Sequence, residues 1–241
     1  MTLPSEARNF GPLRATIFLT ILAAAAAACA QRLPDPVPVP QPGELARTLQ
    51  ATGTPDLPRL IDFKWRYRGR EGRFSGEGGV RINPPDSVRL DLLGPGWSGV
   101  QSAVLVGDDV YYIGEQKITL PPPTFMWSML GIFRPPAGIE PRGARRGDHS
   151  QLTYRLSDRE SVVFLFDAEG LLVEAELQRD GDAVQTIRVL PGEQGNDPEA
   201  FRWPSEGRYR DLVEFLEVQI DVTGTRDHEP FESRIFQAAS R

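Results

Sequence analysis

The chain has 241 residues, 40% of them hydrophobic and 25% charged, and it carries a net charge of −6 and a single cysteine. The hydrophobic fraction excludes a wholly disordered chain, and one cysteine excludes a disulfide framework or a cysteine-rich metal site. No basic run is longer than Arg145-Arg146, which argues against a nucleic-acid-binding protein because such proteins neutralise phosphates with clustered Lys and Arg.

The N-terminus has the pattern of an export signal. Arg8 and Arg14 precede a run of small and apolar residues from Ala15 to Ala28. A membrane-spanning helix needs roughly 20 such residues, so residues 1–28 are interpreted as a signal peptide and not as a transmembrane helix.

The run ends at Cys29, and the stretch Ala26-Ala27-Ala28-Cys29 resembles a bacterial lipobox, although Ala26 stands where Leu is usual. The resemblance implies that Cys29 is acylated and anchors the protein in a membrane. The same resemblance implies that an Asp after the cysteine would retain the protein at the inner membrane, so that Ala30 favours the outer membrane and a domain facing the periplasm. The alternatives are an ordinary secretory signal, with Cys29 incidental, and a short buried helix.

Proline occupies every second position from Pro34 to Pro42. Because proline fixes its own φ and favours extended geometry in the residue before it, residues 29–43 are predicted to be a lipidated cysteine followed by a stiff stalk. A floppy linker is the alternative. A short amphipathic helix is expected over residues 44–50.

From residue 58 the hydrophobic period changes to two. Ile61, Phe63, Trp65 and Tyr67 alternate with charged residues, which places these large side chains on one face of a strand. Similar segments follow at 74–82, 88–92, 104–106, 110–113, 152–156, 162–166, 171–178, 184–190 and 216–222. About ten or eleven strands at this spacing predict a mainly β protein with one large, curved antiparallel sheet or barrel.

The main helix candidate in the body is Thr124–Phe133, between two proline clusters. It is apolar almost all round, so it must be buried or touch lipid. One short helix cannot cover a large sheet, so the apolar face is expected to be only partly filled. Core packing and a ligand site are both open interpretations of this segment.

The chain resembles the lipoprotein carriers LolA and LolB and their relatives. The resemblance covers residues 44–225 and rests on the strand Phe63-Lys64-Trp65-Arg66-Tyr67, the Gly-rich strand 76–82 and the following Pro85-Asp86-Ser87-Val88-Arg89-Leu90-Asp91-Leu92. It implies an unclosed half-barrel with one to three short helices on its concave face, plugging a cavity for acyl chains. Residues 226–241 are expected to be a C-terminal tail, in which Phe231 and Phe236 are the residues that could dock.

Two sets of site residues follow. The apolar cavity is predicted to be lined by Phe63, Trp65, Tyr67, Val80, Ile82, Leu90, Leu92, Val104, Val106, Phe125, Met126, Trp127, Met129, Leu130 and Phe133. In the membrane-anchored member of the family, the loop after the third strand projects an apolar side chain used to insert lipoproteins into the membrane. Trp97 occupies the comparable place here, and folding back as a lid on the sheet edge is the alternative.

Signals for catalysis are weak. Gly94, Gly96 and Gly99 match the spacing of a dinucleotide fingerprint, but a strand and not a helix is expected after them. His149 and His228 have no second ligand at metal-binding spacing. The sequence therefore predicts no enzyme, no cofactor and no metal.

The leading hypothesis is a monomeric, membrane-anchored periplasmic protein that holds acyl chains of lipoproteins or another amphiphile in an apolar concavity and acts in lipoprotein or lipid localisation. The alternative is a structural or sensory envelope lipoprotein that binds a protein partner by edge-strand addition. A carrier or another envelope protein is a further expected partner, and nucleic acid is not.

Overall fold

The computed structural model describes residues 35–94, 99–193 and 201–237. Residues Pro36–Arg241 form one compact unit, which contains the whole of the described sheet and core. In the described part of the chain, no helix has the length and apolarity needed to cross a membrane.

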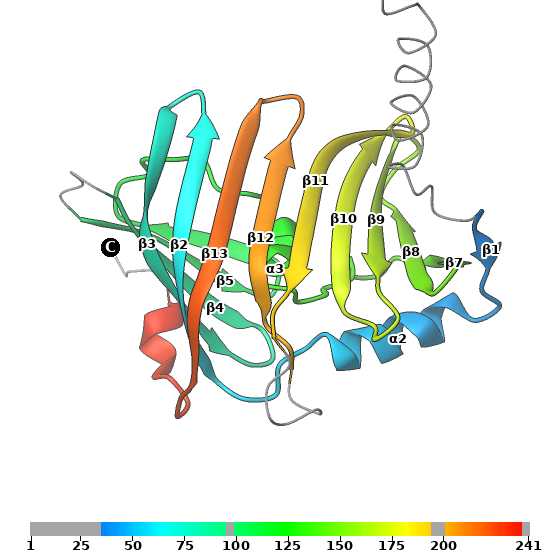
Figure 1. Ribbon diagram of the computed structural model, residues 1–241, viewed down its shortest axis with the longest axis horizontal. Coiled ribbons are helices and arrows are strands. Elements are labelled where there is room, and N and C mark those ends of the chain that lie inside the picture. Colours follow the sequence, from blue (N-terminus) through cyan, green and yellow to red (C-terminus); the bar gives the residue numbers. More distant parts are fainter. Residues whose placement is uncertain (1–34, 95–98, 194–200, 238–241) are drawn as a thin grey trace, which may run out of the picture. The chain divides into compact units, whose positions relative to one another are not determined.

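One antiparallel sheet of 13 strands dominates the unit, in the order β1-β7-β8-β9-β10-β11-β12-β13-β2-β3-β4-β5-β6 (Figure 1). The strands are β1 Val37–Pro38, β2 Arg59–Gly69, β3 Gly72–Asn83, β4 Ser87–Leu93, β5 Val100–Val106, β6 Asp109–Ile113, β7 Arg142–Arg146, β8 His149–Arg155, β9 Glu160–Phe166, β10 Leu172–Arg179, β11 Asp182–Pro191, β12 Pro204–Asp211 and β13 Leu216–Asp227. The sheet curves without closing, which confirms the predicted mainly β, open half-barrel. The expected ten or eleven strands are too few because β1 and β7 are short and lack an alternating apolar pattern, and because β12 has Tyr209 as its one large apolar side chain.

The two ends of the chain contribute more than expected. Val37 and Pro38 pair with Arg145 and Ala144 of β7, so the Pro-rich segment joins the sheet edge before residue 44. At the other end, β13 continues to Asp227, and the 3-10 helix η1, Ser233–Phe236, follows it.

The curvature places bulky side chains over glycines. Trp65 and Phe63 of β2 lie opposite Gly76 and Gly78 of β3. A Cβ on Gly78 would lie 2.5 Å from the Phe63 ring and 2.7 Å from the backbone oxygen of Asp91, so only glycine leaves room for the ring. The Trp65 indole crosses the same strand and donates to the carbonyl oxygens of Glu77 and Leu93 at 3.0 and 3.2 Å.

Two α-helices pack into the same core as the concave face of the sheet. In α2, Pro42–Thr52, Ala46 and Leu49 are buried. α3, Pro123–Met129, is buried along its length and lies against β10, β11 and β12 (Figure 1).

Helix α3 ends earlier than the predicted Phe133. The N–H groups of Gly131 and Ile132 donate to the carbonyls of Ser128 and Trp127, and Gly131 has φ +74. This is the Schellman arrangement, which needs a left-handed residue and so stops the helix at a glycine.

The convex face over β4 and β5 is covered by the C-terminal segment. Arg89 and Asp91 of β4 face this side, and an Arg89 guanidinium nitrogen donates to the backbone oxygen of Ile235 at 3.4 Å. Val104 pairs with Arg89 and shares its face; it is 0% exposed, and η1 contacts its strand. Phe236 was expected to be able to dock onto the domain, and its side chain is buried, with 6% exposed.

Candidate functional site

The concave face encloses an apolar cavity of about 40 Å³. It lies between the sheet, α3 and a segment that we call the strap, residues 115–122, which links β6 to α3. Every lining residue is apolar: Trp65, Val80, Val88, Leu90, Leu92, Leu105, Ile118, Leu120, Pro121, Met126, Trp127, Met129, Leu130, Val218 and Ile220. The cavity has room for only a few water-sized groups, and no lining residue is charged.

The rest of the concave face is packed by aromatic side chains. The Phe133 ring lies 4.9 Å from both the Phe164 and Phe166 rings, edge-on in each case. Phe125 packs against Tyr209 with ring centroids 5.7 Å apart. The expectation of a partly filled face therefore holds for the β2–β5 side, where the cavity lies, and not for the β8–β10 side.

A buried glutamine holds the strap. The Gln101 side chain on β5 donates to the Ile118 carbonyl at 3.0 Å and accepts from the Lys117 and Ile118 N–H groups at 2.7 and 3.1 Å. It thus satisfies three backbone groups that would otherwise be unpaired beside an apolar cavity.

A second contact ties the strap to the β2–β3 hairpin. Glu71, in the turn of that hairpin, accepts hydrogen bonds from the Tyr67 hydroxyl and, at 2.7 Å, from the Thr119 hydroxyl. These two bonds lower the pKa of Glu71. Burial, and then the neighbouring Glu71 carboxylate, raise the pKa of Tyr67, so its hydroxyl stays protonated and can donate.

Trp127 ties helix α3 to the turn between β5 and β6. Its indole N–H donates to the carbonyl oxygen of Gly107, in the β5–β6 turn, at 3.0 Å. The Arg134 guanidinium lies over the same ring, 4.7 Å from its centre. Besides their apolar burial, the strap and α3 are thus tied to the sheet by a small number of identifiable polar contacts.

The structure divides the predicted cavity residues into three groups. The first lines the cavity: Trp65, Val80, Leu90, Leu92, Met126, Trp127, Met129 and Leu130. The second shares the concave core without reaching the cavity: Phe63, Tyr67, Ile82, Phe125 and Phe133.

The third group, Val104 and Val106, is a correction. Residues directly opposite in an antiparallel pair share a face, and Val104 is opposite Arg89, whereas Leu105 is opposite Val88. Leu105 therefore reaches the cavity, and Val104 and Val106 point to the convex side. Ala103-Val104-Leu105-Val106 is apolar at every position, so its alternation gives no sign of which face is inside.

Other lining residues were missed for different reasons. Val88, Val218 and Ile220 lie on strands with clear alternation, which is a signal sufficient to find them. Ile118, Leu120 and Pro121 belong to the strap, which has no periodicity to place it on the sheet. Cys29 and Trp97 lie outside the described residues.

The described residues offer no constellation for metal chemistry, since no group of three or more His, Cys, Asp or Glu side chains among them is placed to hold an ion. The arrangement is suited to binding an apolar group by burial.

No protein-family profile matches this sequence. No curated protein matches it either. Among solved structures, a LolA superfamily protein from Nitrosomonas europaea is similar, with 14% identity and a TM-score of 0.54, over 80% of this chain and 97% of that one. An outer membrane lipoprotein-sorting protein domain from Vibrio parahaemolyticus has 10% identity and a TM-score of 0.42, over 80% of this chain and 94% of that one. The first likeness, with the open sheet described above, shows that this chain has the LolA-like fold.

Proposed function

We propose that this protein binds the acyl chains of lipoproteins or of another amphiphile in the concavity beneath the strap. The observation that carries the proposal is a wholly apolar cavity between the sheet and a strap held by a few polar contacts. Each methylene buried there contributes about 0.8 kcal/mol, so a chain of several methylenes can stabilise a rearranged strap.

Binding requires movement. A cavity of about 40 Å³ is far smaller than an acyl chain, so the strap and α3 must shift outward as the chain enters. Met126 and Met129 line the cavity from α3, and unbranched thioether side chains adapt well to contents of varying shape.

The site of action that we propose is the envelope. The lipobox-like sequence at Cys29 supports a lipid anchor, and Ala30 after it supports the outer membrane with the domain facing the periplasm. Binding by burial needs neither a cofactor nor a catalytic group, so we propose a carrier or receptor and not an enzyme.

Native mass spectrometry of residues 31–241, purified without detergent from an envelope fraction, tests the cavity. A bound mass that disappears on solvent extraction is the expected result. Val88→Phe places a ring in the cavity and should abolish that mass, whereas Val37→Phe, on the exposed β1 strand, should leave it unchanged. An empty protein that also takes up no fluorescent fatty acid would overturn the proposal.

One observation favours a second function. Strand β6 is the last in the sheet order and pairs only with β5 among the described strands, and Tyr111 and Tyr112 on it are partly exposed. An unprotected edge can accept a strand from a protein partner. A stoichiometric complex that Tyr111→Pro abolishes, formed with the cavity empty, would support this function over the first.

A further inference from the structure

We propose that the tip of the β12–β13 hairpin, with the adjoining β2–β3 tip, is a docking surface for an anionic lipid bilayer. The surface consists of Leu212, Val213 and Phe215 from one hairpin and Arg68, Arg70 and Arg73 from the other. None of these residues lines the cavity, and the inference does not depend on the proposed function.

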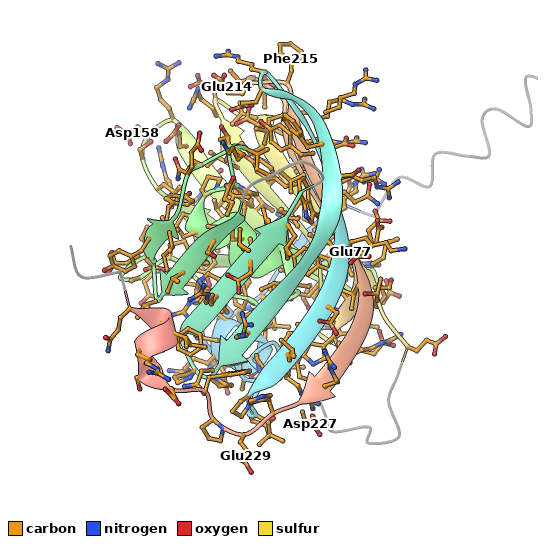
Figure 2. All side chains as sticks on the ribbon, turned by 90° about the vertical axis from the view of Figure 1, so that its left-hand side faces the viewer. Glu77, Asp158, Glu214, Phe215, Asp227 and Glu229 are labelled. Atoms are coloured by element: carbon orange, nitrogen blue, oxygen red, sulfur yellow. The ribbon has the colours of Figure 1, made fainter. Side chains whose placement is uncertain are left out.

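The apolar part is exposed at the outer end of the sheet. Leu212, Val213 and Phe215 are 47%, 52% and 83% exposed. Figure 2 shows Phe215 at the extreme end of the strands, beside Glu214. Adjacent large apolar side chains at one protruding tip are unusual on a water-facing surface and mark a site of interaction.

The backbone presents these side chains at a conformational cost. Phe215 has φ +55, a left-handed conformation that favours Gly or Asn and is strained for an aromatic residue. The turn itself is fixed from below, because buried Asp211 accepts from the N–H groups of Val213 and Glu214 at 2.9 and 2.8 Å. Hydrogen bonds to Asp211 thus fix a turn whose next residue, Phe215, is both strained and exposed.

The charged part adjoins it. An ion pair of 2.6 Å between Arg70 and Glu214 joins the two hairpin tips. The other acid of the β2–β3 tip, Glu71, is already engaged by Tyr67 and Thr119. Arg68 and Arg73 are exposed and lie directly opposite each other, and neither has an ion-pair partner among the described residues. Two like charges in that position repel. Glu217, opposite Arg68 on β13, is already paired with Arg210 at 2.8 Å, so a further anion near both Arg68 and Arg73 would relieve their repulsion.

These features favour a bilayer over a protein as the occupant. A stable protein interface buries about 800 Å² on each partner and needs a complementary face, whereas this surface is a small, convex tip. Apolar side chains on such a tip can enter the interfacial region of a bilayer one by one, while arginines beside them bind lipid phosphates. The overall net charge of −6 opposes contact with an anionic membrane, whereas the two tips, residues 68–73 and 212–215, carry three arginines against Glu71 and Glu214, which favours an approach at this end.

The test is flotation of a fragment, residues 31–241, with vesicles of phosphatidylglycerol and phosphatidylethanolamine. The fragment does not contain Cys29, so it carries no acyl anchor. Binding is expected, and about tenfold weaker binding to pure phosphatidylcholine. Phe215→Asn should reduce binding about tenfold without lowering the melting temperature, because Asn tolerates the left-handed conformation. The double variant Arg68→Gln, Arg73→Gln should bind the anionic vesicles more weakly and phosphatidylcholine vesicles as the wild type does. High salt should have the same effect on the wild type.

Leu190→Ser is the matched control for Leu212→Ser, because Leu190 on β11 is similarly exposed, at 53%, away from the tip. The control should bind as the wild type does and Leu212→Ser should not. The inference is overturned if Phe215→Asn binds normally. It is also overturned if sedimentation shows that the tip forms a dimer that Phe215→Asn dissociates, since the occupant is then a second copy.

Discussion

The side-chain amide of Gln101 hydrogen-bonds both the N–H and the C=O of Ile118. Neighbouring segments of a sheet normally hydrogen-bond through their backbone groups. Here the Gln101 side chain takes that role and joins the strap to the concave side of β5. Rearrangement of this one side chain would release three of the backbone hydrogen bonds that hold the strap and leave the Glu71–Thr119 bond and the apolar contacts of Ile118 and Leu120 to hold it.

Gln101→Ala should destabilise the protein by about 2 kcal/mol, because it leaves backbone groups of Lys117 and Ile118 unpaired in an apolar setting. Urea denaturation measures this loss. The same variant should take up a fluorescent fatty acid faster than the wild type, since the strap is loosened. Gln178→Ala, at a polar position on β10, is the control, and equal uptake rates in the two variants would contradict the role of the strap.

The hydrogen bonds to Glu71 make the stability of the folded protein depend on pH. The pKa of Glu71 in the folded protein is lowered from 4.5, so the stabilisation is present above pH 4.5 and is lost as the pH falls through the folded pKa. The melting temperature of the wild type should therefore fall more steeply below pH 4.5 than that of Glu71→Gln. Parallel curves for the two proteins would show that the carboxylate contributes nothing.

On the convex face, Asp91 is the acceptor on which the C-terminal segment depends. It binds Arg81, Arg89 at 2.9 Å and Ser102 at 2.5 Å, and its side chain is 13% exposed. Asp91→Ala should lower stability by about 2 kcal/mol because two arginines lose their shared partner. Since Arg89 also bonds Ile235, limited proteolysis should cut near η1 faster than in wild type, and faster than in Asp182→Ala, a control at the exposed first residue of β11.

The sequence predicted most strands of the sheet, but it predicted neither the position of the strap nor which face of β5 is inside. Strict alternation in β2 and β13 predicted their inner faces, because each position has a polar neighbour for comparison. The uniformly apolar stretch around Leu105 has no such contrast, and its facing was wrong. The strap is placed by Gln101 and Glu71, which contact residues 16 to 48 positions away, so local pattern could not locate it. The sequence also did not predict that Phe215 is exposed, because the residues after it have the pattern of a strand.

Two neighbouring glycines of β3, Gly78 and Gly79, allow a test of whether Phe63 packs across this strand. Gly78→Ala would place a methyl group against the Phe63 ring and the Asp91 carbonyl, so the ring or strand β4 must move. We expect a loss of about 2 kcal/mol and a wider cavity entrance on the β3–β4 side. Gly79→Ala is the matched control. Its Cβ would meet only the Ile61 carbonyl at 3.7 Å, an ordinary contact, and the loss of chain entropy in the unfolded state should stabilise the protein by about 0.5 kcal/mol. If both substitutions are neutral, Phe63 does not lie across β3, and the curvature of the sheet has another origin.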